Sequence, residues 1–153
     1  MIRYLLLVDK TKLISCGEEE DKKIKIWNLD TFECLRVLEG HSDIVVYLDL
    51  TTEGNLISCS NDKTVILWQL ETGVLLKSIQ FDYFVNCAKV LFNSNLVAIS
   101  INNGEIKMYD LDKLIIIKSI KADSTFVNRL HLLSNGNLLS TSKTEIKLNH
   151  LLE

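Results

Sequence analysis

The sequence contains no proline among its 153 residues and only three alanines. No stretch shows a sustained helical period, and the scarcity of alanine agrees with this. Proline is excluded from most positions of a β-ladder because it has no N–H to donate. Both absences therefore indicate a chain that is mostly strand, with turns built from Gly, Asn, Ser and Thr.

An excess of positive charge is also missing, since 17 Lys and Arg face 20 Asp and Glu, which gives a net charge of -3. Nucleic acid and anionic membrane surfaces attract proteins through basic fields. We therefore expect neither of them as a partner. The content of 47% hydrophobic and 24% charged residues is ordinary for a folded domain and excludes a disordered tail. The length allows one domain at most.

The four cysteines form no Cys-x-x-Cys pair, and no histidine spacing typical of zinc accompanies them. We expect no metal site and no cofactor. Cys16 and Cys59 lie in two identical LISC segments, where a small apolar residue inside a sheet is the simpler interpretation. The opening residues MIRYLLLVDK are too short an apolar run for a signal peptide or a membrane span. These features predict reduced thiols and a cytoplasmic protein, with the nucleus as an alternative.

A repeat runs through the whole chain. The segment LISCGEEEDKKIKIWNL matches LISCSNDKTVILWQL, and more loosely LVAISINNGEIKMYDL and LLSTSKTEIKLNHL. The anchor residues Trp27, Trp68, Tyr109 and Asn149 are separated by 41, 41 and 40 residues. A spacing this regular predicts one structural unit repeated four times.

Each unit reads as four short antiparallel strands. Apolar residues alternate with polar ones, as in Ile24 and Ile26 beside Lys23 and Lys25, and a period of two is typical of strands. Turn residues such as Thr-Glu-Gly-Asn at 52–55 separate them. In the second unit the predicted strands are 45–50, 56–60, 64–69 and 74–79. The fold class is all-β.

Four-stranded units of this length resemble the blades of the WD-repeat β-propeller family. The second unit carries Gly40 and His41 before its first strand and Trp68 on its third. The resemblance implies that a buried tetrad joins four of its side chains. The carboxylate accepts from the histidine, the histidine reaches the hydroxyl, and the hydroxyl meets the indole N–H. The implied tetrad is His41, Ser58, Asp62 and Trp68.

The other units match this tetrad only in part. The first offers Ser15, Asp21 and Trp27, with the aspartate displaced by a two-residue insertion among Glu18–Glu20. In the third, the matched residues are Phe81 for histidine, Ala98 for serine, Asn103 for aspartate and Tyr109 for tryptophan. The fourth offers Asp123, Ser140 and Asn149, without a clear turn aspartate.

The resemblance divides the chain into blades at about 1–39, 40–80, 81–121 and 122–153, the last without its outer strand. A little under four blades is about half of the family's usual ring. We therefore expect an open, partial propeller: a fragment, the product of an incomplete gene model, or half of an assembly. The uncovered sides of its end blades invite self-association.

A column of apolar residues three places after the histidine position predicts a partner-binding rim. It consists of Ile44, Phe84 and Phe126, and Tyr83 adds a further aromatic beside Phe84. Aromatic side chains at an exposed rim are typical binding anchors, although Phe84 could instead pack between blades. Other proteins are the expected partners.

The function favoured by these observations is a non-catalytic scaffold for protein–protein interaction. A substrate-recognition adaptor of a ubiquitin ligase is an alternative. The segments Trp27-Asn28-Leu29-Asp30 and Tyr109-Asp110-Leu111-Asp112 lack the basic residue that ligase-docking motifs carry after Trp-Asp, and no F-box-like helices precede the repeats. A propeller enzyme is a further alternative, since His41, Asp62 and Ser58 are the residue types of a nucleophilic triad. A serine in mid-strand beneath a tryptophan is badly placed for attack, so we expect no enzyme and no catalytic residue.

Overall fold

The computed structural model describes residues 2–17, 22–91, 95–123 and 126–149. All of the regular secondary structure in these ranges is β-strand. In chain order the strands are β1 Ile2–Leu7, β2 Lys12–Gly17, β3 Ile24–Asn28, β4 Cys34–Leu38, β5 Val45–Leu50, β6 Leu56–Ser60, β7 Thr64–Gln69, β8 Val74–Gln80, β9 Val85–Leu91, β10 Leu96–Ile101, β11 Glu105–Asp110, β12 Ile115–Lys121, β13 Arg129–Leu132, β14 Leu138–Thr141 and β15 Ile146–Asn149.

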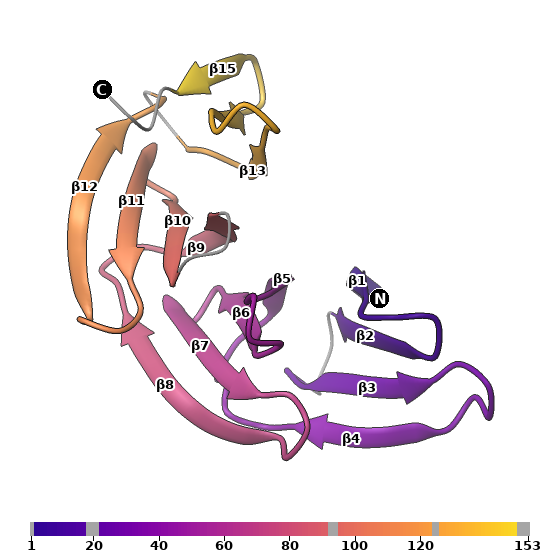
Figure 1. Cartoon of the computed structure of the whole chain (residues 1–153). Coiled ribbons are helices and arrows are strands. Elements are labelled where there is room, and N and C mark those ends of the chain that lie inside the picture. Colours follow the sequence, from indigo (N-terminus) through magenta and orange to yellow (C-terminus); the bar gives the residue numbers. More distant parts are fainter. Residues whose placement is uncertain (1, 18–21, 92–94, 124–125, 150–153) are drawn as a thin grey trace.

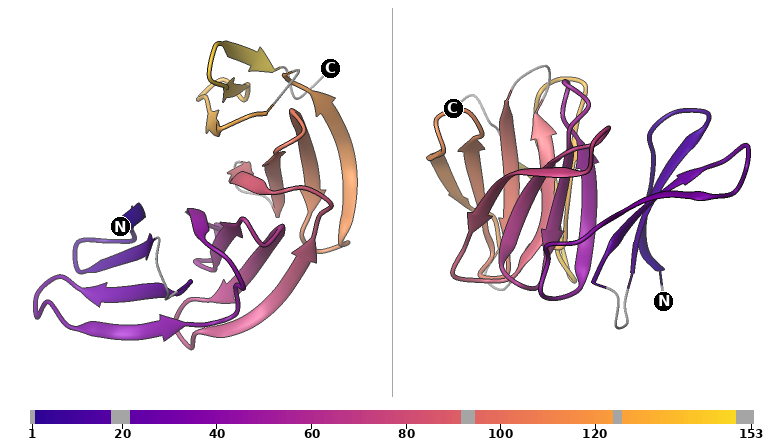
Figure 2. Two further views of the ribbon diagram at one scale, coloured as in Figure 1. Left: turned by 180° about the vertical axis from the view of Figure 1, so that it is seen from behind. Right: turned by 90° about the horizontal axis from the view of Figure 1, so that it is seen from below.

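The strands form four antiparallel sheets, each made of consecutive strands in chain order. The first three blades are β1–β4, β5–β8 and β9–β12, and the described part of the fourth is β13–β15. The blades fan out along an arc, with inner strands β1, β5, β9 and β13 on its concave side (Figure 1). The first and fourth blades lie at the two ends of the arc, on either side of its opening (Figure 2). The predicted fold class, an all-β open propeller of about four blades, is confirmed.

Alternation and turn chemistry define the second blade closely. Strands β5, β6 and β7 have the ranges predicted from the sequence, and β8 extends one residue further, to Gln80. The β5–β6 turn is closed by Thr51, whose carbonyl accepts from Gly54 N and whose hydroxyl accepts from Asn55 N at 3.0 Å. These local bonds fix the register of the hairpin.

Neighbouring blades pack through two sets of apolar positions. The first set lies on the third strand of each blade, on both sides of the residue that pairs with the central position of the second strand. We call these two residues the flanking pair. The flanking pairs are Ile24 and Ile26, Val65 and Leu67, Ile106 and Met108, and Ile146 and Leu148.

The second set, which we call the inner pair, lies on the innermost strand or directly before it. The inner pairs are Ile2 and Leu5, Val45 and Leu48, Val85 and Ala88, and Val127 and Leu130. The flanking pair of the first blade and the inner pair of the second belong to one buried cluster. A second cluster contains the flanking pairs of the second and third blades and the inner pairs of the third and fourth. Each blade is thus covered by the next one along the chain.

Polar contacts join the inner strands across these interfaces. Lys89 on β9 donates to the Asp49 carboxylate on β5 at 2.8 Å, and Val90 N donates to the same oxygen at 3.1 Å. Asn86 on β9 donates to the Val127 carbonyl at 2.9 Å. The inner strands are therefore held by hydrogen bonds as well as by apolar packing.

An aromatic cluster occupies the concave side of the arc. The rings of Tyr4 on β1 and Tyr47 on β5 have centroids 4.7 Å apart. The guanidinium carbon of Arg129, on β13, lies 5.6 Å from the Tyr4 centroid and 5.4 Å from the Tyr47 centroid. This cation–π contact connects the fourth blade to the first and second. A membrane-spanning helix is not found anywhere in the described part of the chain.

Gly104 closes the β10–β11 turn where the third blade meets the segment leading to the fourth. Its φ is 81°, and a Cβ there would lie 2.2 Å from the Asp123 carbonyl oxygen. The Gly104 carbonyl also accepts from Ala122 N and Asp123 N, at 3.0 and 3.1 Å. The close approach of these two backbones requires glycine.

We expect Gly104→Ala to lower the free energy of unfolding by about 1–3 kcal/mol more than Gly54→Ala, because only the former adds a steric clash. Gly54 has nearly the same φ, 79°, and its Cβ would meet nothing within 4 Å. Gly54→Ala should therefore cost only the left-handed strain of about 1–2 kcal/mol. Urea unfolding of both variants measures the difference. Equal losses would contradict the role of the Asp123 contact.

Candidate functional site

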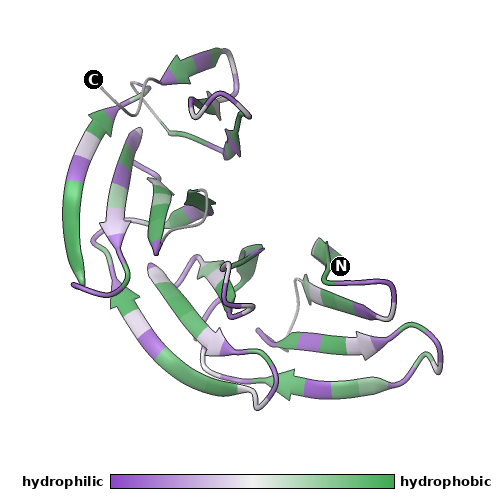
Figure 3. Cartoon of the chain, viewed as in Figure 1, coloured by the Kyte–Doolittle hydropathy of each residue, from purple (hydrophilic) through white to green (hydrophobic). Residues whose placement is uncertain are grey.

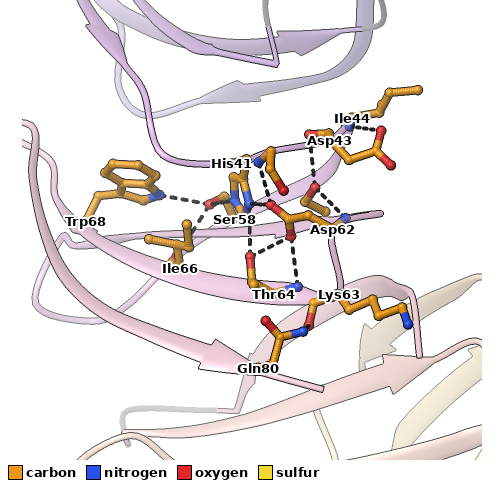
Figure 4. Close-up of polar contacts among 12 residues, drawn as sticks. His41, Asp43, Ile44, Ser58, Asp62, Lys63, Thr64, Ile66, Trp68 and Gln80 are labelled. Atoms are coloured by element: carbon orange, nitrogen blue, oxygen red, sulfur yellow. Dashed lines mark hydrogen bonds and ion pairs between the residues drawn. The ribbon is translucent and has the colours of Figure 1, made fainter. Parts of the chain in front are cut away.

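A hydrogen-bonded network at one end of the second blade joins the four residues of the implied tetrad (Figure 4). The His41 ring, in the loop before β5, lies 2.8 Å from Asp62 through Nδ1 and 2.7 Å from Ser58 Oγ through Nε2. The Trp68 Nε1–H donates to the same Ser58 oxygen at 2.8 Å. The network therefore connects a loop, a mid-strand hydroxyl, a turn and the third strand.

Asp62 is the most heavily bonded member of the network. Besides His41, its carboxylate accepts from Ser42 N at 2.9 Å, Thr64 N at 2.9 Å and the Thr64 hydroxyl at 2.6 Å. Burial alone would raise the pKa of the Asp62 carboxyl, but these hydrogen bonds and the His41 ring hold the pKa well below its ordinary value. The side chain is only 6% exposed, so the ionised carboxylate depends on these donors.

The geometry of Ser58 is that of a structural hydroxyl. Ser58 is 0% exposed, and its oxygen is engaged by the Trp68 indole and the His41 ring. With His41 donating from Nδ1 to Asp62, Nε2 is free to accept the Ser58 proton. A nucleophilic serine needs an open approach for a substrate carbonyl. The spacing of a catalytic triad is present, but its serine is covered.

In the described parts of the first and fourth blades, one bond of the network has a counterpart. Trp27 Nε1–H donates to Ser15 Oγ at 2.8 Å, and Asn149 Nδ2–H donates to Ser140 Oγ at 2.8 Å. Asparagine thus replaces the indole as donor in the fourth blade. Asp21, the predicted carboxylate of the first blade, lies outside the described residues.

The third blade replaces the network by apolar packing, and here one sequence match is wrong. Ile99, not Ala98, occupies the serine position, because Ile99 pairs with Lys107 as Ser58 pairs with Ile66. The sequence match LVAIS to LISCS is displaced by one residue, since the third blade has one residue more before its turn. Ile99 is 0% exposed and Phe81, at the histidine position, 8%.

The two other third-blade residues lie apart from such a network. Asn103 Oδ1 accepts from Glu105 N at 3.0 Å, so its side chain stabilises its own turn. Tyr109 is 7% exposed, and burial raises the pKa of its hydroxyl. Both residues instead line a groove of about 630 Å³ between β8 and β11–β12. The groove is also lined by polar side chains of both blades, Gln80, Asp82, Glu105 and Lys107.

The predicted rim residues lie at one position in successive blades. Ile44, Phe84 and Phe126 each precede a fully buried valine of an inner pair. The Ile44 and Phe84 carbonyls accept the same kind of bond, from Asn61 N at 3.0 Å and Asn102 N at 2.9 Å. Phe84 is 44% exposed, whereas Ile44 and Phe126 are half-buried.

Tyr83 is the most exposed of the predicted rim residues, at 51%. It lines the groove between the second and third blades. Phe126 is instead approached by a cation, because Lys143 Nζ lies 5.7 Å from its ring centroid. Partner binding by this rim stays a prediction.

Three of the four cysteines have the environment of small apolar residues. Cys16, Cys59 and Cys87 are buried and Cys34 is exposed, all as free thiols. Burial raises the pKa of Cys16 and of Cys87 to about 12, so both remain protonated and weakly nucleophilic. Within the described ranges no cluster of three or more His, Cys, Asp or Glu side chains could hold a metal ion.

Two contributions were missed by reasoning from sequence. Thr64 belongs to the network through both its N–H and its hydroxyl, and the Asp-x-Thr spacing typical of an Asx turn could have indicated it. The cluster of Tyr4, Tyr47 and Arg129 was also missed. The two tyrosines hold one register position, since each pairs with the cysteine of an LISC segment, and this was a usable signal.

Removing the Ser58 hydroxyl should be more costly than removing that of Ser15. Ser58→Ala leaves both the Trp68 N–H and the His41 ring without a partner in a buried site, and we expect a loss of about 2–3 kcal/mol in unfolding free energy. Ser15→Ala leaves one indole N–H in a partly buried site and should cost about 1 kcal/mol. Chemical denaturation of both variants tests this. A smaller loss for Ser58→Ala would show that the network contributes little.

Acid should weaken the second blade through Asp62. Because folding lowers the pKa of this carboxyl from its ordinary 3.8, its contribution is complete above about pH 5 and is lost as the pH falls through and below 4. We expect Asp62→Asn to be about 2–3 kcal/mol less stable at neutral pH. The variant should also lose less stability than the wild type between pH 7 and about pH 3. Denaturation midpoints across this range measure both effects, and parallel pH profiles would refute the assignment.

Comparison with known proteins identifies the repeat. Residues 32–69 match the family model described as WD domain, G-beta repeat. The chain is 33% identical over 107 residues to the probable coatomer subunit beta' of Schizosaccharomyces pombe, covering 69% of this chain and 13% of that protein. It is 26% identical over 121 residues to the F-box/WD repeat-containing protein sel-10 of Caenorhabditis elegans, covering 76% of this chain and 20% of that protein.

A solved structure shows the same fold over nearly the whole chain. The structure titled "Structure of U3-55K" superposes with a TM-score of 0.86 at 16% sequence identity, over 96% of this chain and 48% of that one. This chain thus spans about half of that structure and about a fifth or less of the two curated relatives. The match to the family model falls mainly on the blade that holds the complete network, and the likeness in fold extends to the other blades. The chain belongs to the WD-repeat β-propeller family.

Proposed function

We propose that this chain is a non-catalytic scaffold that docks other proteins through the surface formed by Tyr83, Phe84 and the adjoining groove. The observation that carries the proposal is the pair of exposed aromatic rings beside that groove. Tyr83 is 51% and Phe84 44% exposed, and Tyr83 also lines the groove of about 630 Å³. Aromatic side chains with a large contact area and few rotatable bonds are favoured at binding hot spots.

The two aromatics are held by a rigid base. Phe81 is 8% and Val85 0% exposed, so the segment between β8 and β9 is anchored at both ends. The Phe84 carbonyl is fixed by Asn102 N at 2.9 Å, and the Phe81 N–H donates to the Lys63 carbonyl at 2.9 Å. A preorganised surface loses less conformational entropy when a partner binds.

The groove adds polar groups that can specify a partner. Glu105 and Lys107 form an ion pair at 3.8 Å, and their side chains are 33% and 23% exposed. Together with Asp82 and Asn103 they offer donors and acceptors next to an aromatic anchor. Such a mixture suits a polypeptide with both backbone amides and side chains to recognise. The overall charge of -3 makes nucleic acid and anionic membranes poor candidates, and we propose a cytoplasmic location, with the nucleus as an alternative.

A substrate-recognition adaptor of a ubiquitin ligase is the second candidate. It is supported by the similarity to the F-box/WD repeat-containing protein sel-10, which this chain matches over a fifth of its length. The two candidates differ in what the docked protein undergoes. An adaptor requires that a bound protein be recruited to a ligase, whereas a scaffold requires binding alone.

A propeller enzyme is disfavoured by the burial of its best nucleophile. Ser58 is 0% exposed and bonded on both sides. The thiols of Cys16 and Cys87 remain protonated because burial raises their pKa to about 12. Their burial therefore supports a structural role for Ser58 and for both thiols.

Alanine at Tyr83 and Phe84 should reduce recovery of a bound partner about tenfold or more, because each truncation removes a rigid anchor worth about 1–2 kcal/mol. Both rings are half-exposed, so the free energy of unfolding should stay within about 0.5 kcal/mol of the wild-type value. Leu114→Ala is the matched control, an exposed residue (52%) in the turn between β11 and β12.

The measurement is quantitative affinity capture followed by mass spectrometry on the three proteins. Proteins whose recovery falls in the double variant but not in Leu114→Ala are bound by the proposed surface. Unchanged recovery of every captured protein in the double variant would refute the proposed docking surface. Ubiquitylation of a captured protein that requires the wild-type surface would favour the adaptor.

A further inference from the structure

The fourth blade exposes a flanking pair that every earlier blade buries. The pairs of the first three blades are between 0% and 8% exposed. In the fourth blade, Ile146 is 72% and Leu148 49% exposed. Both residues are as apolar as their counterparts, and the strand has the same alternation. The end of the arc therefore presents one half of an inter-blade interface.

The first blade exposes the complementary half. The inner pairs of the second, third and fourth blades are 0% or 1% exposed. In the first blade, Ile2 is 63% and Leu5 53% exposed. In the second blade the same positions, Val45 and Leu48, are covered by the flanking pair of the first. The two ends of the arc thus carry the two sides of one kind of contact.

A hollow accompanies the exposed inner pair. It has a volume of about 280 Å³ and is lined by Ile2, Leu5, Leu13 and Trp27, among others. Trp68, which corresponds to Trp27, is 1% exposed in the second blade. The first blade differs from the second at one nearby position. Lys25, which pairs with Ser15, stands where the second blade has the apolar Ile66, which pairs with Ser58.

We propose that the fourth blade of one copy of this chain packs head to tail on the first blade of a second copy. In this contact, Ile146 and Leu148 enter the hollow beside Ile2 and Leu5, as Ile24 and Ile26 pack on the second blade. The interface continues the packing already present three times within the chain. It is independent of the surface at Tyr83 and Phe84.

A second copy is the occupant that the structure best matches. Both halves of the contact are on the same chain, so no other protein is needed to supply either. The arc superposes on 48% of the solved propeller structure. A second copy would therefore supply an arc about as large as the remaining part of that structure. Two arcs joined head to tail form the contact twice, and a closed pair gains from both contacts at once.

The apolar outer strands provide a control for nonspecific association. Strands β8 and β12 each begin with a run of hydrophobic residues that is followed by polar ones (Figure 3), and Ile115 and Ile117 on β12 are 50% and 52% exposed. Strand β12 is the outermost strand of the third blade and lies on the convex side of the arc (Figure 1). Nonspecific hydrophobic association would depend on the exposed residues of these outer strands as much as on those of the end blades.

The experiment is sedimentation velocity of the full chain over a concentration series. We expect a reversible dimer for the wild type. A fourth-blade variant, Ile146→Asp with Leu148→Asp, should weaken the dimer by at least about tenfold, because the charges would be buried in the contact. A first-blade variant, Ile2→Asp with Leu5→Asp, should do the same. The control, Ile115→Asp with Ile117→Asp, should dimerise like the wild type.

Mixing the two end variants gives the decisive measurement. Each has one intact half, so an equimolar mixture should regain a heterodimer through one contact, while neither variant does so alone. Circular dichroism confirms that each variant is folded, and a milder pair, Leu148→Ser and Leu5→Ser, replaces any that is not. A wild-type chain that stays monomeric, a mixture that does not recover, or a dimer lost only in the control would each overturn the proposal.

Discussion

Burial of each blade against the next is the interaction on which the rest of this structure depends. A small antiparallel sheet is only marginally stable on its own and needs its apolar face covered. Here the covering is supplied by repetition, because the flanking pair of each of the first three blades packs on the inner pair of the following blade. Both clusters are continuous along the chain. The curvature of the arc follows from this contact.

The hydrogen-bonded network of the second blade has a more local task. Among the residues that the structure describes, it is complete in the second blade alone, and the third blade keeps the same fold with Ile99 and Phe81 in place of serine and histidine. The network therefore cannot be what makes a blade. Its donors Ser42 and Thr64 belong to a loop and a strand that meet at Asp62. What it stabilises is the relative placement of those segments at the end of the blade, next to the first rim position.

Much of this architecture could be predicted from the sequence because its determinants are local or periodic. The alternation of apolar residues and the turn at 52–55 placed β5–β7 at their observed limits. Aligning similar letters was less dependable: it placed Ala98 at the serine position, although strand pairing assigns Ile99. Counting back from the turn residue Asn103, as from Asp62 to Ser58, would have given the right residue. Similar sequences can be aligned one residue out of register, whereas a one-residue shift in a pleated strand moves every side chain to the other face.

The groove and the approach of Arg129 to the two tyrosines could not be predicted from the sequence, for a different reason. Arg129 meets Tyr4 across the concave side of the arc, 125 positions apart in the chain, and the approach depends on how tightly successive blades turn. The rotation from one blade to the next depends on the sizes of the side chains packed between them, and no single segment of the sequence reveals it. The contact lies within the chain, so it favours this curvature without the help of a partner. A protein that bridges both ends of the arc at once must therefore fit the opening that this curvature leaves between them.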